Sequence, residues 1–162
     1  MWETARMAGY FAAHAVWSVS DGETLVPMYG YETPDGRRGL DRFPGDLRAA
    51  ATAVRAALRD NPHGAVHAVS VLDAFIDLPG GKTDALIVEA VGYPPADFAL
   101  RMAIPYRPED GAAGFAVHRP KFLGVTGAPQ EEYQKVAEAF FEGVDAHEKA
   151  GPIWAAHLDE SR

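Results

Sequence analysis

Three stretches of the chain place apolar or aromatic side chains at every third or fourth position, which is the spacing of an amphipathic helix. The first contains Met7, Tyr10, Phe11, His14 and Trp17, and the second, after a capping Asp46, contains Leu47, Ala51, Val54 and Leu58. The third follows Pro129 with Tyr133, Val136, Ala137, Phe140, Phe141 and Val144, and a short segment beyond Gly151-Pro152 carries Ile153, Trp154 and Leu158. The sequence therefore predicts three helices and a short fourth one. A strand over residues 15–20 with a turn at Asp21-Gly22 is the alternative for the end of the first.

Between these helices lie segments in which apolar and polar residues alternate, or in which apolar and β-branched residues follow one another without interruption. Gly, Pro and Asp bound these segments, as is typical of β-strands. The expected strands cover residues 25–32, 37–43, 65–78, 83–91, 98–106 and 115–122. The turn at Pro79-Gly80-Gly81-Lys82 makes the third and fourth of them a hairpin. Pro120 cannot donate to a ladder, which places the end of the last strand at an edge.

The order of elements is α-ββ-α-ββββ-α-α, and the loops are short. This predicts the α+β class, with a predominantly antiparallel sheet of four to six strands and helices packed on one face. With no repeat or long linker, residues 1–162 are expected to form a single domain. The order is similar to that of roadblock and profilin-like domains, in which helices interrupt a five-stranded antiparallel sheet; the similarity is one of topology alone.

The charge balance argues against nucleic-acid and membrane partners. Fifteen Lys and Arg residues against 23 Asp and Glu residues give a net charge of −8, so a duplex or an anionic membrane would be repelled. No apolar run is as long as the ~18 residues that a membrane span needs. The first twenty residues lack the basic start and small-residue end of a signal peptide, so a cytoplasmic location is expected.

The residues that several kinds of catalytic and binding site require are missing from the sequence. The chain has no cysteine, which excludes disulfides, thiolate nucleophiles and Cys-based metal sites. Gly81-Lys82-Thr83 ends like a phosphate-binding loop, but Ile76 stands where the first glycine belongs. His147-Glu148 begins like a zinc-protease helix, but Gly151 occupies the position of the second histidine. No metal and no cofactor are therefore expected.

One face of the strand over residues 65–78 combines titratable with large apolar side chains: His67, Val69, Val71, Asp73, Phe75 and Asp77. The other face is uniformly small or apolar and is expected to be the helix-covered core. Glu89 and Arg101 on the next two strands would join the mixed face in some registers. His67, Asp73 and Glu89 would then form an acid–base set or a small-ligand pocket. The alternatives are an ordinary outer sheet face, or a homodimer interface centred on Val69, Val71 and Phe75.

A second candidate is a local excess of positive charge between residues 101 and 121. Its members are Arg101, Arg107, His118, Arg119 and Lys121. In an acidic protein such a group would hold a carboxylate, a phosphate or an acidic partner surface. The alternative is that these residues protect an edge strand against aggregation.

No complete catalytic motif is present, so the sequence favours a binding or regulatory module over an enzyme. Self-association as a homodimer is expected, through the mixed sheet face or the segment around Trp154. The alternative function is a small-molecule enzyme or an anionic-ligand pocket around His67, Asp73, Glu89 and Arg101.

Overall fold

The computed structural model describes all residues, 1–162, and has the α+β class and the order of elements that the sequence predicts. The helices are α1 (Trp2–Val19), α2 (Leu47–Asp60), α3 (Tyr133–Ala146) and α4 (Ala150–Ala156). The strands are β1 (Met28–Glu32), β2 (Arg38–Arg42), β3 (His67–Leu78), β4 (Gly81–Gly92), β5 (Phe98–Arg107), β6 (Ala116–Val117) and β7 (Lys121–Thr126). A 3₁₀ turn, Gln130–Glu132, leads into α3. No helix combines the length and the apolar character needed to cross a membrane.

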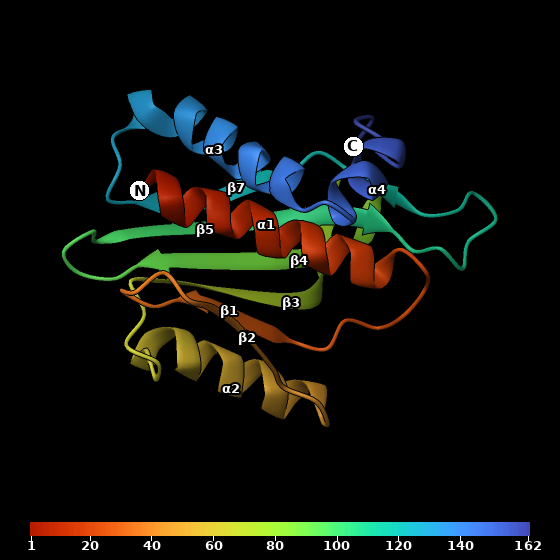
Figure 1. Cartoon of the computed structure of the whole chain (residues 1–162). Helices are drawn as coiled ribbons and strands as arrows, with labels where there is room; N and C mark the ends of the chain where they lie inside the picture. The colour runs from red at the N-terminus through yellow and green to blue at the C-terminus, as the bar shows by residue number, and fades with distance from the viewer.

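All the strands belong to one antiparallel sheet in the order β2-β1-β3-β4-β5-β7, with β6 pairing the end of β5 (Figure 1). The hairpin of β3 and β4 is its centre and pairs twelve residues of each strand, from His67 opposite Gly92 to Leu78 opposite Gly81. Gly81 has a φ of 114°, a conformation that favours glycine and that closes this turn. The sequence prediction of a hairpin here is confirmed.

The last predicted strand is divided in two, which raises the number of strands to seven. Residues 116–117 pair with Tyr106 and Arg107 at the end of β5, whereas β7 pairs with the first half of β5. Between them the chain passes through Pro120, which has no N–H for a ladder. The register of β5 against β7 also shifts between Arg101 and Met102, so one partner strand cannot follow β5 along its whole length.

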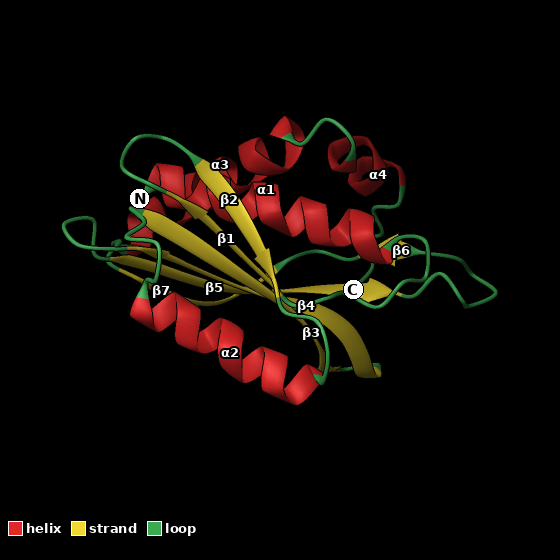
Figure 2. Ribbon diagram, turned by 60° about the horizontal axis from the view of Figure 1, so that its bottom comes forward, coloured by secondary structure: helices red, strands yellow, loops and turns green.

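The helices cover both faces of the sheet, not one as the sequence suggested. Figures 1 and 2 show α1, α3 and α4 on one face and α2 alone on the other. The reason lies in β3, whose central part is apolar on both sides. Val69 and Val71 face α1 in the main core, and Ala68 and Leu72 face α2 in a smaller cluster.

Helix α2 begins where the sequence predicts, because the Asp46 carboxylate accepts a hydrogen bond of 2.9 Å from the backbone N–H of Ala49. Its buried residues are Ala50, Val54 and Leu58. Leu47, which the sequence placed in the buried stripe, is 56% exposed. The helix therefore buries a narrow stripe and packs mainly on β1 and β3. Farther along this face, Ala85, Ile87 and Ala103 of β4 and β5 form a small buried cluster that no helix covers.

Helices α1 and α3 approach so closely that their backbones touch at two glycines. A Cβ atom on Gly9 would lie 1.8 Å from the carbonyl oxygen of Phe140, and one on Gly143 would lie 1.8 Å from that of Arg6. No side chain fits at either position, since real Cβ atoms do not come closer than about 3 Å to other heavy atoms. The two glycines thus set the distance between the helices.

We expect Gly9→Ala and Gly143→Ala each to lower the free energy of unfolding by about 2–3 kcal/mol, because the added methyl must push two helix backbones apart. Urea denaturation followed by circular dichroism measures the change. Gly124→Ala is the matched control, since a Cβ there meets nothing within 4 Å. Equal stability of the three variants would contradict the close contact.

Candidate functional site

The four residues proposed for the sheet face do not form one site. His67 and Asp73 lie on the face under α1, six residues apart along β3. Glu89 and Arg101 lie on the opposite face, where their side chains pair with each other at 3.6 Å. No cavity collects all four, so the structure gives no support to the acid–base set or ligand pocket proposed around them.

His67 has a structural environment instead. Its Nε2 lies 2.8 Å from the Glu32 carboxylate, and its Nδ1 lies 3.3 Å from the Thr4 hydroxyl of α1. The hydrogen bonds from His67 and Arg38 hold the pKa of Glu32 below its usual value, although partial burial opposes them. His67 therefore ties the start of α1 to the paired ends of β1 and β3.

Three of the apolar side chains expected at a dimer interface are buried within one chain. Val69 and Val71 are fully buried beneath α1, which corrects the hypothesis that they form the centre of an interface. Trp154 is 3% exposed and packs edge-on against Phe140 and Phe141. Of the mixed face, Phe75 remains 60% exposed.

The basic group of residues 101–121 is partly brought together. Arg107 and His118 line one cavity of about 370 Å³, and Lys121 lines an adjoining one. Arg119 points elsewhere and pairs with Glu160 at 3.1 Å, and Arg101 is on the far part of the sheet. The cavity therefore contains fewer of the predicted basic residues than the sequence suggested, and residues that were not predicted complete its lining.

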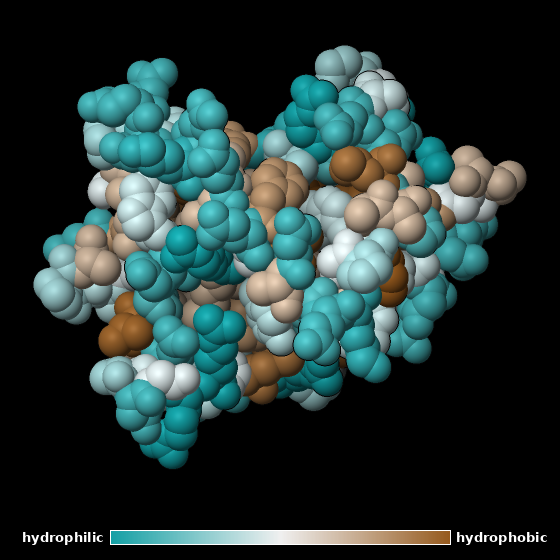
Figure 3. Space-filling view, turned by 45° about the horizontal axis from the view of Figure 1, so that its top comes forward, coloured by the Kyte–Doolittle hydropathy of each residue, from teal (hydrophilic) through white to brown (hydrophobic).

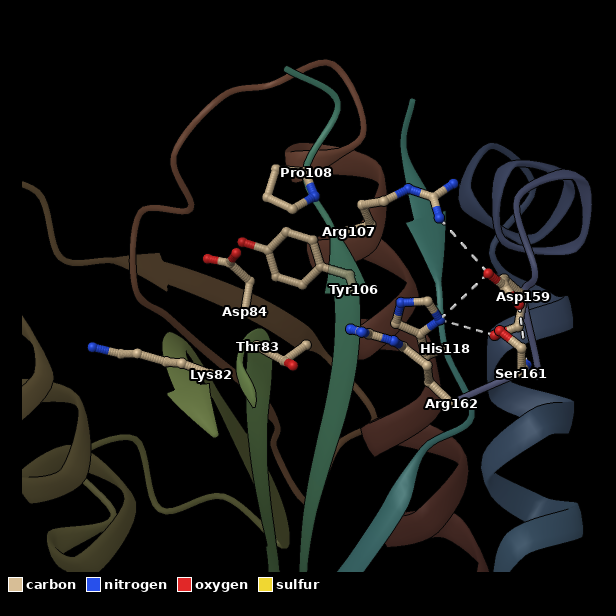
Figure 4. Close-up of a pocket in the computed structure, with 10 residues that line it drawn as sticks. All are labelled: Lys82, Thr83, Asp84, Tyr106, Arg107, Pro108, His118, Asp159, Ser161 and Arg162. Carbon is tan, nitrogen blue, oxygen red and sulfur yellow. Dashed lines mark hydrogen bonds and ion pairs between the residues drawn. The ribbon is translucent and has the colours of Figure 1, made fainter. Parts of the chain in front are cut away.

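The cavity lies where the β3–β4 hairpin, the end of β5 and the C-terminal segment meet (Figure 4). Its lining residues are polar or charged with few exceptions: Lys82, Thr83, Asp84, Tyr106, Arg107, Pro108, His118, Asp159, Ser161 and Arg162. Figure 4 shows Asp84, Tyr106, His118 and Arg162 around a common space, with the Lys82 ammonium pointing away from it. Its volume is within the range of small-molecule sites, roughly 300–1,000 Å³.

The C-terminal segment is held against β6 by backbone hydrogen bonds. The N–H of Val117 donates to the carbonyl of His157 at 2.9 Å, and the N–H of Asp159 donates to the carbonyl of Val117 at 2.8 Å. Val117 and Leu158 accordingly form a parallel bridge. This contact brings Asp159, Ser161 and Arg162 to the cavity.

His118 is the most deeply buried titratable group of the cavity, with 2% of its surface exposed. Its Nδ1 lies 2.9 Å from the backbone carbonyl of Asp159. A carbonyl only accepts, so Nδ1 carries the proton and Nε2 of the neutral ring has a free lone pair. Nε2 makes no hydrogen bond within the chain, and Figure 4 shows it on the side of the ring away from Asp159, facing the space beside Tyr106.

Arg107 and Asp159 form the charged wall next to His118. The Arg107 guanidinium donates to the carbonyls of Gly114 at 2.8 Å and Ala113 at 3.1 Å, and it lies 3.8 Å from the Asp159 carboxylate. Hydrogen bonds from Ser161, together with the nearby Arg107 charge, hold the pKa of Asp159 below its ordinary value. Asp159 is therefore ionised at neutral pH, and both groups are fixed in place.

The charges of the cavity lining differ from those of the whole chain. Arg107 and Arg162 balance the carboxylates of Asp84 and Asp159, and the Lys82 ammonium lies over the Phe75 ring at 4.5 Å, pointing away from His118 (Figure 4). The net charge of the whole chain is −8. A small anion therefore meets less repulsion at this cavity than over the rest of the surface.

Tyr106 connects the cavity to the core side of β3. Its hydroxyl donates to both oxygens of the Asp73 carboxylate, at 2.9 and 2.8 Å. Burial raises the pKa of Asp73, an effect that the Tyr106 hydrogen bond opposes, and burial likewise raises the pKa of Tyr106. Burial also raises the pKa of Asp84, whose charge disfavours the ionised Asp73. The carboxyl groups of Asp73 and Asp84, both with raised pKa values, therefore lie on the Tyr106 side of the cavity.

The sequence reasoning missed the part of the site that comes from residues 159–162. These residues have no motif, and only the pairing with β6 brings them to the cavity. No group of three or more His, Asp or Glu side chains in the structure is arranged to hold a metal ion.

Comparisons with known proteins give no family for this chain. No family model, no curated protein and no solved structure matches it. No function is therefore available from a relative, and the site has to be interpreted from its own geometry.

The Asp73–Tyr106 pair predicts a pH-dependent stability. The folded-state pKa of Asp73 is raised, so ionising it costs stability as the pH rises through that pKa, and the cost is absent below the unfolded pKa of ~3.9. Asp73→Asn keeps an acceptor for Tyr106 and removes the charge. We expect it to stabilise the fold near neutral pH by no more than about 1 kcal/mol, because solvent screens the partly exposed carboxylate.

Urea denaturation of the wild type and of Asp73→Asn, at neutral pH and in acid below the ordinary carboxyl pKa, measures this effect. The advantage of the variant should shrink as the pH falls. Asp77→Asn is the matched control, on the same strand and face but exposed. An advantage that does not change with pH would show that burial of the charge is not its cause.

Proposed function

We propose that the chain is a binding module for a small anion that also carries a proton donor, such as a phosphate or a hydroxycarboxylate, and that it binds this ligand in the cavity at His118. The observation that carries the proposal is the buried His118 ring, whose Nδ1 is held by a carbonyl and whose Nε2 has no partner within the chain and faces the cavity. A ligand in the cavity can therefore reach Nε2 and bond to it.

The two parts of the ligand correspond to two parts of the cavity. Arg107 and Arg162 supply the positive charge that an anionic group needs. With the ring proton on Nδ1, the lone pair of His118 Nε2 accepts from an O–H or N–H. Phosphate near neutral pH carries both a charge and a proton, and so does a hydroxycarboxylate such as glycolate. Sulfate and acetate have the charge without the donor.

Isothermal titration calorimetry with phosphate against sulfate, and with glycolate against acetate, tests the proposal. We expect the donor-bearing member of each pair to bind about tenfold more tightly, because one hydrogen bond to a buried group contributes about 1–1.5 kcal/mol. The comparison of phosphate with glycolate then shows which anionic group fits. Equal binding within both pairs, or no binding at all, would contradict it.

His118→Asn separates the two ring nitrogens. The asparagine amide can still donate to the Asp159 carbonyl in place of Nδ1, but nothing replaces Nε2. We expect this variant to remain folded and to lose about tenfold in affinity for the better ligand.

His157→Asn is the matched control for His118→Asn. The Nδ1 of His157 makes the same kind of bond, to the Ile153 carbonyl at 2.8 Å, but His157 is exposed and does not line the cavity. Its affinity should stay at the wild-type value. If the two variants bind alike, His118 does not hold the ligand.

Self-association and a cytoplasmic location remain predictions of the sequence. A homodimer would have to use apolar side chains that the single chain leaves exposed, such as Phe122 and Leu123 on the outer strand β7, which are 41% and 49% exposed. On the face seen in Figure 3 the hydrophobic atoms form separate patches among polar ones. Sedimentation velocity over a range of concentrations measures the oligomeric state.

A further inference from the structure

Two histidines that are 133 residues apart in the sequence meet at the turn from α3 to α4. His14 lies in the second half of α1, and His147 directly follows the last residue of α3. Nδ1 of His14 lies 3.0 Å from Nε2 of His147, and the ring centroids are 5.3 Å apart. Both rings line a second cavity, of about 450 Å³, which shares no residue with the cavity at His118.

The contacts of His147 hold the turn against α1. The rings of Tyr10 and Trp17, both on α1, lie against the His147 ring with centroid distances of 4.8 and 5.7 Å. His147 is buried, and only residues 147–149 separate α3 from α4. The contact with α1 therefore fixes the position at which α4 begins.

The hydrogen bond between His147 and α4 requires a neutral ring. The backbone N–H of Ala150, the first residue of α4, donates to Nδ1 of His147 at 3.0 Å. An amide N–H only donates, so Nδ1 accepts and carries no proton. A second proton on the ring would have to go to Nδ1, where it would face the N–H of Ala150. Protonation of His147 therefore breaks this bond.

His14 faces a positive charge on its other side. Its Nε2 lies 3.2 Å from Nη2 of Arg42 on β2. Arginine has only donors, and both nitrogens of a protonated histidine are donors as well. A protonated His14 thus finds no acceptor in Arg42, whichever nitrogen carries the proton of the neutral ring. If His147 is protonated too, two N–H groups also meet at the 3.0 Å contact between the rings.

No carboxylate is placed to compensate a charge on either ring. His63, His67 and His118 each have a carboxylate oxygen within 4.0 Å, whereas His14 and His147 have none. Protonation of His14 or His147 therefore adds a positive charge without forming an ion pair.

The other charged groups around the pair are of both signs. Lys149 and, on β2, Arg38 lie 5.8 and 5.7 Å from the centroids of the two aromatic rings of α1 that contact His147. Glu148 is the single carboxylate of the cavity lining, and Asp145 at the end of α3 is exposed. Neither acidic group forms an ion pair with a ring, so neither offsets the cost of protonation.

Burial lowers the pKa of both rings, and at His14 the neighbouring His147 and Arg42 lower it further. Both rings are therefore neutral at neutral pH. Once the turn opens, the rings are exposed and take up protons near the ordinary value of about 6.5. Because the closed turn then binds fewer protons than the open one, its stability falls as the pH drops below about 6.5.

We propose that His14 and His147 form an acid-sensitive contact, which holds the α3–α4 turn on α1 near neutral pH and releases it when the rings are protonated. Because α4 leads into the segment that completes the cavity at His118, release of the turn would also loosen that cavity. The contact itself involves no ligand and is independent of the function proposed for His118.

Amide hydrogen–deuterium exchange, measured by NMR at about pH 7.5 and about pH 5.5, tests the release of the turn. The probe is the N–H of Ala150, and the reference is that of Val88 in β4, a strand that is paired on both sides. Protection factors remove the intrinsic dependence of exchange on pH. Each ring that is protonated only in the open state favours opening about tenfold at one pH unit below 6.5.

We therefore expect the protection of Ala150 to fall at least about tenfold between the two pH values, while that of Val88 stays the same. An unchanged protection of Ala150 would overturn the proposal. An equal fall at both amides would overturn it as well, because the whole chain would then open and not the turn.

Substitutions show whether the two rings cause the fall. His147→Asn removes the titration and keeps the acceptor, since the asparagine carbonyl oxygen can accept from the N–H of Ala150. His14→Asn likewise cannot take up a proton. In the double variant the protection of Ala150 should change by less than about twofold over the same pH range.

His157→Asn is the matched control for the double variant, because His157 is exposed and lies outside the second cavity. It should keep the fall in the protection of Ala150 that the wild type shows. A double variant that falls as much as this control does would show that other groups open the turn.

The wild-type chain gives a second measurement that needs no substitution. The ring C–H signals of His14 and His147 report the protonation of each ring in an NMR titration. Their midpoints should lie below about 6.5, and the protection of Ala150 should fall over the same pH range. Midpoints at or above this value would refute the proposal, because the rings would then be protonated with the turn still closed.

Discussion

The contact of α1 with α3 at Gly9 and Gly143 is the constraint on which the rest of the structure depends. The helix backbones touch there, so the distance between the helices is fixed by main-chain atoms and not by side chains that can adapt. Helix α1 in turn covers the sheet with a buried face in which five of the eleven residues are alanine. The position of α3 relative to the sheet is therefore set by the main chain at two points.

Both cavities inherit their geometry from this contact. The end of α3 brings His147 to within hydrogen-bonding distance of His14 on α1, which forms the second cavity. From there α4 carries the chain back to β6, where Leu158 pairs with Val117 and the C-terminal segment completes the first cavity. A rotation of α3 would displace residues of both sites.

Much of the secondary structure follows from the sequence, because local pattern determines it. The strand spans, the Asp46 cap and the turn at Gly81 are all readable from neighbouring residues. The assignment of faces is not. Val69 and Ala68 are both apolar, so alternation alone does not say which side a helix covers; the sequence predicts helices on one face, whereas the structure has them on both.

The sites were harder to predict, because their members are distant along the chain. The basic residues Arg107 and His118 are close enough in sequence to attract attention, and both line the cavity. The partner segment at residue 159 lies 41 positions beyond His118, and His147 lies 133 positions from His14. Each of these residues can be noted in the sequence by itself. Only the long-range packing of the helices on the sheet shows which of them come together.

The division of β5 between two partner strands has a mechanical consequence. Its first half is held inside the main sheet by β4 and β7, but its last two residues, Tyr106 and Arg107, have β6 on one side, and β6 is itself held by the C-terminal segment. A molecule bound at His118 would clamp three segments that are otherwise joined by a few backbone hydrogen bonds. Occupancy would then slow the local opening of that whole corner, including chain that the bound molecule never touches.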